Sequence, residues 1–217
     1  MLDFTVKSSV HNYEVKFIED AINVLKNEIR DGDVIIIDNK VKLLNPYLLK
    51  NLNCKISVIG IDAHEENKSY KGLIPIIQEL IRSGFRKNHR LIGIGGGIIQ
   101  DITAFSASIM YRGVDWLFFP TTLLAQGDSC IGSKTSINFG EYKNQVGGFY
   151  PPSKILINNL CPIENRHDRI NSMKSYYFFM VSNFSLNSRS SRTLLVSISP
   201  ESHFNLKSAS ASLPPCF

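Results

Sequence analysis

The 217-residue sequence contains only four cysteines, and none of them forms a Cys-x-x-Cys pair or another metal-ligand spacing. Its five histidines show no His-x-x-x-His or His-Glu-x-x-His pattern, so a metal site built from neighbouring residues is not expected. The apolar run nearest to a membrane span, YYFFMV at 176–181, is far shorter than the ~18 residues required. The opening residues lack the apolar core of a secretory leader, so we expect a cytoplasmic protein without a membrane partner.

Charge of one sign is not concentrated anywhere in the chain. The formal net charge is +5, but no run of five or more like charges occurs. A nucleic-acid partner is therefore not expected. The positive excess indicates either a mild attraction for phosphate ligands or an ordinary solvated surface.

The first 160 residues show alternating strand and helix patterns instead. With 43% hydrophobic and 20% charged residues, the composition is that of a globular protein. Apolar runs predict strands at 33–38, 55–61, 90–95, 115–120 and 154–158, and helix-period segments at 69–84 and 98–113 each stop at a glycine. This order predicts an α/β fold, a Rossmann-like parallel sheet flanked by helices.

The composition and the hydrophobic pattern of the sequence change after Asn159. The remaining residues are rich in serine, and neither the helix period nor the strand period persists in them. Such a stretch buries too little apolar surface to offset its ordering entropy. We therefore expect one α/β domain over 1–159 and an irregular, Ser-rich tail over 160–217 that is either disordered or poorly packed.

Three consecutive glycines follow a predicted strand in LIGIGGGIIQDITAF (91–105). At a strand-to-helix turn, glycine lets a ligand approach the backbone, and the helix end presents unpaired N–H groups to a pyrophosphate. Gly95, Gly96 and Gly97 therefore indicate a phosphate cradle, unless they only allow the helix to pack closely on the strand. A standard Rossmann site is disfavoured, because Ile98 stands where the GxGxxG fingerprint requires glycine.

Two aspartates are candidates for contacts beside this turn. Asp38 closes the strand VIIID and precedes Asn39, so it is either a ribose ligand at a carboxyl strand end or part of an ordinary Asp–Asn turn. Asp101 is expected in the first turn of the helix, where a carboxylate favours the helix dipole. Because an anion there opposes phosphate binding, a functional Asp101 would hold a sugar hydroxyl or a positively charged ring.

A second group of small and charged residues lies between 120 and 150. Lysines on glycine-rich loops are typical of phosphate clamps, although each lysine alone is equally typical of a solvated loop. The Walker pattern GxxxxGK[ST] is absent. The polar members are Thr121, Thr122, Asp128, Ser129, Lys134, Thr135, Lys143 and Asn144.

Through the motifs GGGIIQD, YRG, PTTLLAQGDS, GSKTSIN and KNQVGGFYPP, the sequence resembles 3-dehydroquinate synthase and, more broadly, the sugar phosphate cyclases. The resemblance covers about residues 30–158. It implies an N-terminal NAD-binding α/β domain followed by a mostly helical metal-binding domain, with the active site between them. It also implies a homodimer that acts in the shikimate pathway of aromatic amino acid biosynthesis, with NAD and a divalent metal, Zn or Co, as cofactors.

The same resemblance implies roles for individual residues. The substrate is a seven-carbon keto-acid phosphate, which loses phosphate after transient oxidation by NAD and closes to a ring by an internal aldol step. The implied cofactor residues are Asp38, Asn39, Glu65 and Lys68 at the adenosine part, Gly95, Gly96 and Gly97 at the pyrophosphate, Asp101 at the nicotinamide ribose, and Thr121 and Thr122 along the site. The implied substrate residues are Asp128, Lys134, Lys143 and Asn144, with Arg112 reaching the phosphate site from a neighbouring subunit.

Several positions depart from the family pattern. Gln100 and Ser133 stand where family members usually have glycine, and Tyr142 precedes Lys143 where glycine is common, so the identity of the substrate stays open. The family's metal ligands, one Glu and two His, have no matching motif after Leu160. We therefore expect no metal ligands in this chain and an aberrant ending from a shifted reading frame or altered splicing. The alternatives to a dehydroquinate synthase-like enzyme are another sugar phosphate cyclase and a nucleotide-binding remnant without turnover.

Overall fold

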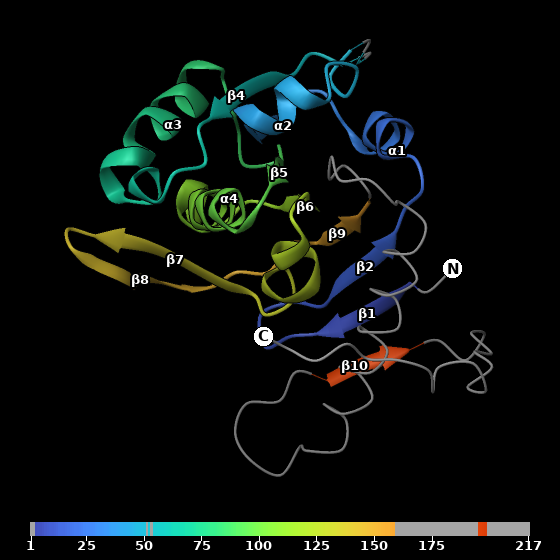
Figure 1. Ribbon diagram of the computed structural model, residues 1–217. Coiled ribbons are helices and arrows are strands. Elements are labelled where there is room, and N and C mark those ends of the chain that lie inside the picture. Colours follow the sequence, from blue (N-terminus) through green and yellow to red (C-terminus); the bar gives the residue numbers. More distant parts are fainter. Residues whose placement is uncertain (1–2, 51, 53, 159–194, 199–217) are drawn as a thin grey trace.

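A mostly parallel sheet of eight strands is the centre of the computed structural model, which describes residues 3–50, 52, 54–158 and 195–198 (Figure 1). Its strands are β1 (Phe4–Lys7), β2 (Tyr13–Phe17), β3 (Val34–Asp38), β4 (Ser57–Ile61), β5 (Leu91–Gly95), β6 (Trp116–Pro120), β9 (Lys154–Ile157) and β10 (Leu195–Ile198). The spatial order is β10-β1-β2-β9-β6-β5-β3-β4. Strand β1 is antiparallel to β2 and β10, and every other neighbouring pair is parallel.

The strand order creates a switch point between β3 and β5. Among the parallel strands β3, β4, β5, β6 and β9, the chain first moves outward from β3 to β4 and then returns to the other side of β3 with β5. Ligands of open α/β sheets bind beyond the carboxyl ends of the strands at such a point. Asp38 ends β3 and Gly95 ends β5. These two predicted cofactor residues therefore lie at this edge of the sheet.

Helices cover both faces of the sheet (Figure 1). They are α1 (Ala21–Glu28), α2 (Asn39–Leu44), α3 (Tyr70–Arg82) and α4 (Gly97–Ile109), with short helical turns η1 (Glu65–Asn67), η2 (Met110–Arg112) and η3 (Ala125–Ser129). Side chains cap most of these helices: Asp20 accepts from the N–H groups of Ile22 and Asn23 at α1, and Ser69 accepts from that of Gly72 at α3. The helix α4 differs, because its N-cap is Gly96 and no side chain caps it.

Alternation along the central strands separates two hydrophobic cores. In β3, Val34 and Ile36 face the core beneath α3 and α4, whereas Ile35 and Ile37 face the core beneath α1 and α2. All four side chains are at most 2% exposed. A strand buried on both faces reads as a continuous apolar run, which is why the sequence IIID was recognisable as a central parallel strand.

The predicted fold class is confirmed, and the predicted elements correspond to β3, β4, β5, β6, β9, α3 and α4. Gly84, with φ of +74°, ends α3 as expected, and the N–H of Phe85 donates to the carbonyl of Leu80. The predicted end of α4 at Gly113 was wrong. The helix stops at Ile109, because Tyr111 and Arg112 adopt positive φ values of 49° and 63° that a helix cannot continue through.

A long hairpin, β7 (Lys134–Phe139) and β8 (Tyr142–Phe149), corrects the prediction of glycine-rich loops in this region. Figure 1 shows it extending past α4 beyond the sheet. The glycines favoured the loop interpretation, but Gly147 stands where a Cβ would meet the carbonyl oxygen of Thr135 at 1.8 Å. Glycine is therefore required here by the close approach of two strands and not by a turn.

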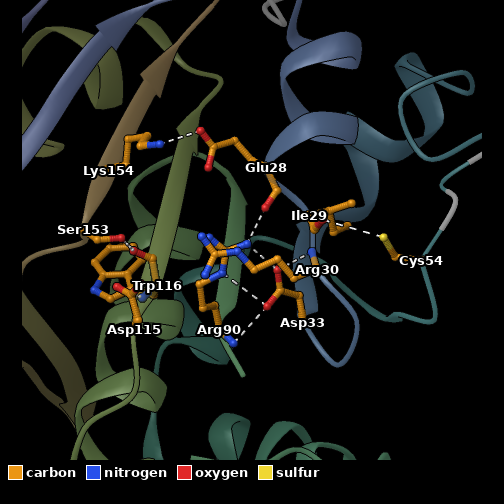
Figure 2. Close-up of polar contacts among 10 residues, drawn as sticks. All are labelled: Glu28, Ile29, Arg30, Asp33, Cys54, Arg90, Asp115, Trp116, Ser153 and Lys154. Atoms are coloured by element: carbon orange, nitrogen blue, oxygen red, sulfur yellow. Dashed lines mark hydrogen bonds and ion pairs between the residues drawn. The ribbon is translucent and has the colours of Figure 1, made fainter. Parts of the chain in front are cut away.

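A buried ion pair joins the helix α1 to the amino ends of the central strands (Figure 2). The Nη2 of Arg90 lies 2.7 Å from Oδ2 of Asp33 and also donates to the carbonyl of Glu28. Asp33 accepts two further main-chain N–H groups, those of Arg30 and Arg90. Both side chains are almost fully buried, so each charge depends on the other. This cluster lies at the edge opposite to the predicted site.

The predicted tail over 160–217 lies outside the described residues except for β10, which pairs with β1 from Phe4 to Lys7. Within the described part of the chain, no helix is long and apolar enough to cross a membrane.

Candidate functional site

The glycine turn lies at the carboxyl edge of the sheet, where β5 meets α4. Gly96 and Gly97 leave the first turn of α4 without a side-chain cap. A Cβ at Gly97 would have its nearest neighbour, the Oγ of Ser129, at 3.7 Å, which is an ordinary van der Waals contact, so a Cβ fits here without displacing a neighbour. The first N–H groups of the 13-residue helix α4 are therefore available to an anion.

The three glycines serve different purposes. A Cβ at Gly95 would lie 2.4 Å from Cγ1 of Ile99, and one at Gly96 would lie 2.9 Å from Cγ2 of Thr122. Gly95 thus permits close packing of α4 on its own strand, which agrees with the packing alternative drawn from the sequence, whereas a Cβ at Gly97 would make only an ordinary contact.

Thr121 extends the site onto β6. Its N–H donates to the carbonyl of Gly95 at 2.9 Å, and its buried hydroxyl has no hydrogen-bond partner among the described residues. A buried hydroxyl without a partner is costly unless a ligand or water supplies one. Thr122 is exposed, and its Oγ1 accepts the N–H of Ala125.

Asp38 and Asn39 lie across the switch point from the glycines. Asp38 caps α2 by accepting the N–H of Lys40 at 2.9 Å, which agrees with the turn alternative. Asn39 donates from Nδ2 to Oδ1 of Asp62 at 2.8 Å. Their position at the end of β3 is also the one that a ribose-binding pair requires, so the ribose role stays a prediction.

A buried lysine connects the remaining predicted cofactor residues. The Nζ of Lys68 lies 3.1 Å from Oδ2 of Asp101, 2.7 Å from Oδ1 of Asn144 and 3.5 Å from Oε1 of Glu65. We call these four residues the Lys68 cluster. The side chain of Lys68 is only 8% exposed, so these contacts replace most of its water.

The Lys68 cluster joins three separate parts of the chain. Glu65 belongs to η1, and Lys68 directly follows η1. Asp101 belongs to α4, and Asn144 belongs to β8. The expectation that Asp101 lies in the first turn of α4 was wrong, because the helix begins at Gly97 and its first turn holds no acidic residue. Asp101 instead faces Lys68, so an ion pair and not the helix dipole is its main electrostatic contact.

Burial and charge move the two carboxyl groups of this cluster in opposite directions. Burial raises the pKa of Asp101, and the nearby Lys68 ammonium opposes this rise. The hydrogen bond from Asn138 lowers the pKa of Glu65, and the charges of Lys68 and Lys143 lower it further. Its partners therefore stabilise the Glu65 carboxylate, whereas at Asp101 the Lys68 ammonium favours the ionised form and burial disfavours it.

The predicted substrate residues do not all come together. Lys134 pairs with Phe149 at one end of the hairpin, and Lys143 adjoins Tyr142 near the turn, so the two exposed lysines lie roughly 15 Å apart along the strands. Asp128 is in η3. Arg112 is exposed in the left-handed segment after α4.

Two polar residues that the sequence did not single out complete the geometry. Asn138 in β7 bonds to Glu65 and to the N–H of Asn144. Gln100, noted only as a departure from glycine, donates to the carbonyl of Ser129 at 2.7 Å and accepts from its hydroxyl at 3.0 Å. This exchange holds the end of η3 against α4. Spacing along the chain carries no signal for either contact.

Comparison with known proteins matches residues 58–167 to the family model described as 3-dehydroquinate synthase N-terminal. The chain belongs to this family. It is 39% identical over 158 residues to 3-dehydroquinate synthase of Campylobacter hominis, covering 67% of this chain and 46% of that protein. It is 36% identical over 165 residues to the Prochlorococcus marinus enzyme, covering 70% and 45%. The chain thus spans about half the length of the curated relatives it matches.

Solved structures agree with this 3-dehydroquinate synthase N-terminal fold. A crystal structure of 2-deoxy-scyllo-inosose synthase complexed with carbaglucose-6-phosphate, NAD+ and Co2+ matches with a TM-score of 0.65 at 22% identity, over 72% of this chain and 45% of that one. At that identity it supports the fold alone. The structure of 2-epi-5-epi-valiolone synthase from Streptomyces hygroscopicus, with NAD+ and Zn2+ bound, matches with a TM-score of 0.59 at 28% identity, over 67% and 42%.

Proposed function

We propose that this chain binds NAD at the carboxyl edge of its sheet and contributes the cofactor half of a 3-dehydroquinate synthase-like cyclase. The observation that carries the proposal is the uncapped start of α4 at Gly96 and Gly97, next to the unpartnered buried hydroxyl of Thr121. Open amides suit the pyrophosphate, and Asp38 and Asn39 lie across the switch point where the adenosine ribose would bind. The 28% identical NAD-bound structure supports the same cofactor.

Bound NAD supplies a hydride acceptor for the transient oxidation of a substrate alcohol. Oxidation makes the neighbouring C–H acidic, so the departing phosphate can help to remove that proton. The lysines Lys134 and Lys143 and the guanidinium of Arg112 stabilise the anionic groups of the substrate, while Asp128 and Asn144 orient its hydroxyls. Glu65 and Lys68 contact the adenosine part of NAD, and Asp101, which forms an ion pair with Lys68, contacts the nicotinamide ribose.

The reaction that we propose is phosphate elimination from a seven-carbon keto-acid phosphate followed by intramolecular aldol closure, as a step of the shikimate pathway. A role of Arg112 at the phosphate of a neighbouring subunit further implies a homodimer. A divalent metal does not fit the part of the chain that the structure describes, since no group of three or more His, Cys, Asp or Glu residues converges there. No step above therefore uses a metal.

Calorimetric titration with NAD tests the binding step directly. We expect one site per chain and a rise in the melting temperature of the complex. Absence of both effects would exclude the proposal.

Phosphate release tests the reaction and its alternatives on one preparation, with zinc or cobalt supplied. Release from the seven-carbon keto-acid phosphate supports the dehydroquinate synthase reaction, and release from a hexose 6-phosphate alone supports another cyclase. NAD binding without release from either substrate supports the alternative of a nucleotide-binding protein without turnover.

A further inference from the structure

Asn138 connects the turn at Glu65 to the β7–β8 hairpin. It is 7% exposed and lies where the register between the two strands shifts. Its Nδ2 donates to Oε1 of Glu65 at 2.8 Å and to the main-chain oxygen of Glu65 at 3.3 Å, and its Oδ1 accepts the N–H of Asn144 at 2.9 Å. Both N–H donors and the oxygen of this amide are therefore used.

The main chain of Asn138 adds a second connection to the same turn. Its N–H donates to the carbonyl of Lys68 at 2.8 Å, and the adjacent Ser69 forms an isolated parallel bridge with Asn138. The hairpin is thus attached to the segment after η1 by main-chain and side-chain bonds at one residue. A side chain held this firmly has a defined orientation.

The two residues that the side chain of Asn138 contacts, Glu65 and Asn144, are both partners of the Lys68 ammonium. Asn144 has a φ of +56°, a left-handed conformation that its bond to Asn138 helps to hold. We propose that Asn138 is a positioning residue of the cofactor site, which fixes the Glu65 carboxylate and the Asn144 amide around Lys68. This inference rests on the proposed function, because it takes Glu65 and Lys68 as residues that bind NAD.

The competing view is that Asn138 is only a satisfied buried asparagine. Asn158 provides the matched control, because it is equally exposed at 7% and, among the described residues, its Nδ2 donates only to the main-chain oxygen of Ile18. Replacing either residue by alanine removes a buried amide. Only replacement of Asn138 disconnects Glu65 and Asn144.

The experiment measures NAD affinity as a function of pH for Asn138→Ala, Asn158→Ala and the wild-type chain. We expect Asn138→Ala to weaken NAD binding about tenfold at pH 7, because it removes a hydrogen bond to a charged group. The pKa of Glu65 should rise without this bond, and Lys68, Lys143 and Asp101 are the other charged groups that act on it. The acid limb of binding then moves to higher pH, whereas Asn158→Ala lowers the melting temperature and leaves that limb unchanged.

Exchanging the donor and the acceptor between residues 138 and 65 distinguishes the loss of this one contact from general misfolding. Asn138→Asp keeps an acceptor for the N–H of Asn144 but sets two carboxylates against each other. Adding Glu65→Gln lets an amide donate to the new carboxylate, so we expect the double variant to recover the melting temperature that Asn138→Asp loses, whereas its NAD affinity stays low because the Glu65 carboxylate is absent.

The outcomes separate this inference from the proposed function. If the wild-type chain binds NAD and Asn138→Ala binds it equally tightly with the same pH profile, the positioning role is overturned while the proposed function stands. The same follows if the double variant binds NAD as tightly as the wild-type chain although the Glu65 carboxylate is absent. If the wild-type chain does not bind NAD, the proposed function fails and the positioning role fails with it.

Discussion

The Nζ of Lys68 lies 3.1 Å from Oδ2 of Asp101, and this contact links the segment after η1 to the second turn of α4. Because Lys68 is nearly fully buried, its ammonium lies close to Asp101 and opposes the rise that burial causes in the pKa of that carboxyl group.

Replacing Lys68 by methionine should therefore destabilise the protein by about 2 kcal/mol at pH 7. The pKa of Asp101, already raised by burial, should rise further without the ammonium. A raised carboxyl pKa makes folding more favourable at low pH and less favourable as the pH rises through it. Urea unfolding of Lys68→Met at pH 5 and pH 7 should show the smaller loss at pH 5. Adding Asp101→Asn should remove this pH dependence, and its persistence would contradict the pairing.

Alanine at Gly95 and at Gly97 separates packing from ligand binding. Gly95→Ala should destabilise the fold by about 2 kcal/mol, because its Cβ would overlap Ile99. Gly97→Ala should leave the unfolding free energy within about 1 kcal/mol, because a Cβ fits there without displacing a neighbour, but should weaken NAD binding at least tenfold if the amide meets the pyrophosphate. Urea unfolding and calorimetric titration check the pair. Unchanged NAD affinity in Gly97→Ala would contradict a cradle at this turn.

Loss of the buried ion pair at the opposite edge of the sheet should lower the free energy of unfolding much more than loss of an exposed ion pair. Asp33→Ala leaves the Arg90 guanidinium without its carboxylate, which is expected to cost about 3–5 kcal/mol. The pair of Lys16 and Glu14 is about half exposed, so Glu14→Ala should cost less than about 1 kcal/mol. Denaturant titration of both variants measures the difference, and equal losses would show that the buried pair is not a main support of the sheet.

Tyr13 should make the protein sensitive to alkali. Burial raises its pKa to about 12, and the side chain is 1% exposed. Since the unfolded phenol ionises near pH 10, the folded state loses stability as the pH rises from about 10 to 12, by about 2 kcal/mol. The difference in unfolding free energy between wild type and Tyr13→Phe should change over this range. A constant difference would show that Tyr13 has the same pKa in the folded and unfolded states.

The sequence predicts the central layer of this fold well because burial on both faces leaves a local signal. The runs at β3 and β5 are continuous and apolar, and the glycine after α3 marks its end. The strands β1 and β2 are short, and the pairing of β2 with β9 depends on residues far along the chain, so no local pattern reveals them.

In the candidate site too, the sequence predicts the local part and not the contacts between distant segments. The glycine turn is local, and its place after a strand is readable from spacing alone. The Lys68 cluster is not, because Asp101 and Asn144 approach Lys68 from separate elements. The contacts of Asn138 and Gln100 could not be predicted, because an amide in a strand or helix has no distinctive spacing and its partners come from other elements.

The pairing of β2 with β9 can form only late in the synthesis of the chain. Asn158 donates to the carbonyl of Ile18 across a separation of 140 residues. At roughly 5–20 residues per second, the ribosome needs about 7–30 s to synthesise that interval. During this time β2 lacks its parallel neighbour β9, so the apolar side chains of the β1–β2 hairpin stay incompletely covered until residues 154–157 have been synthesised.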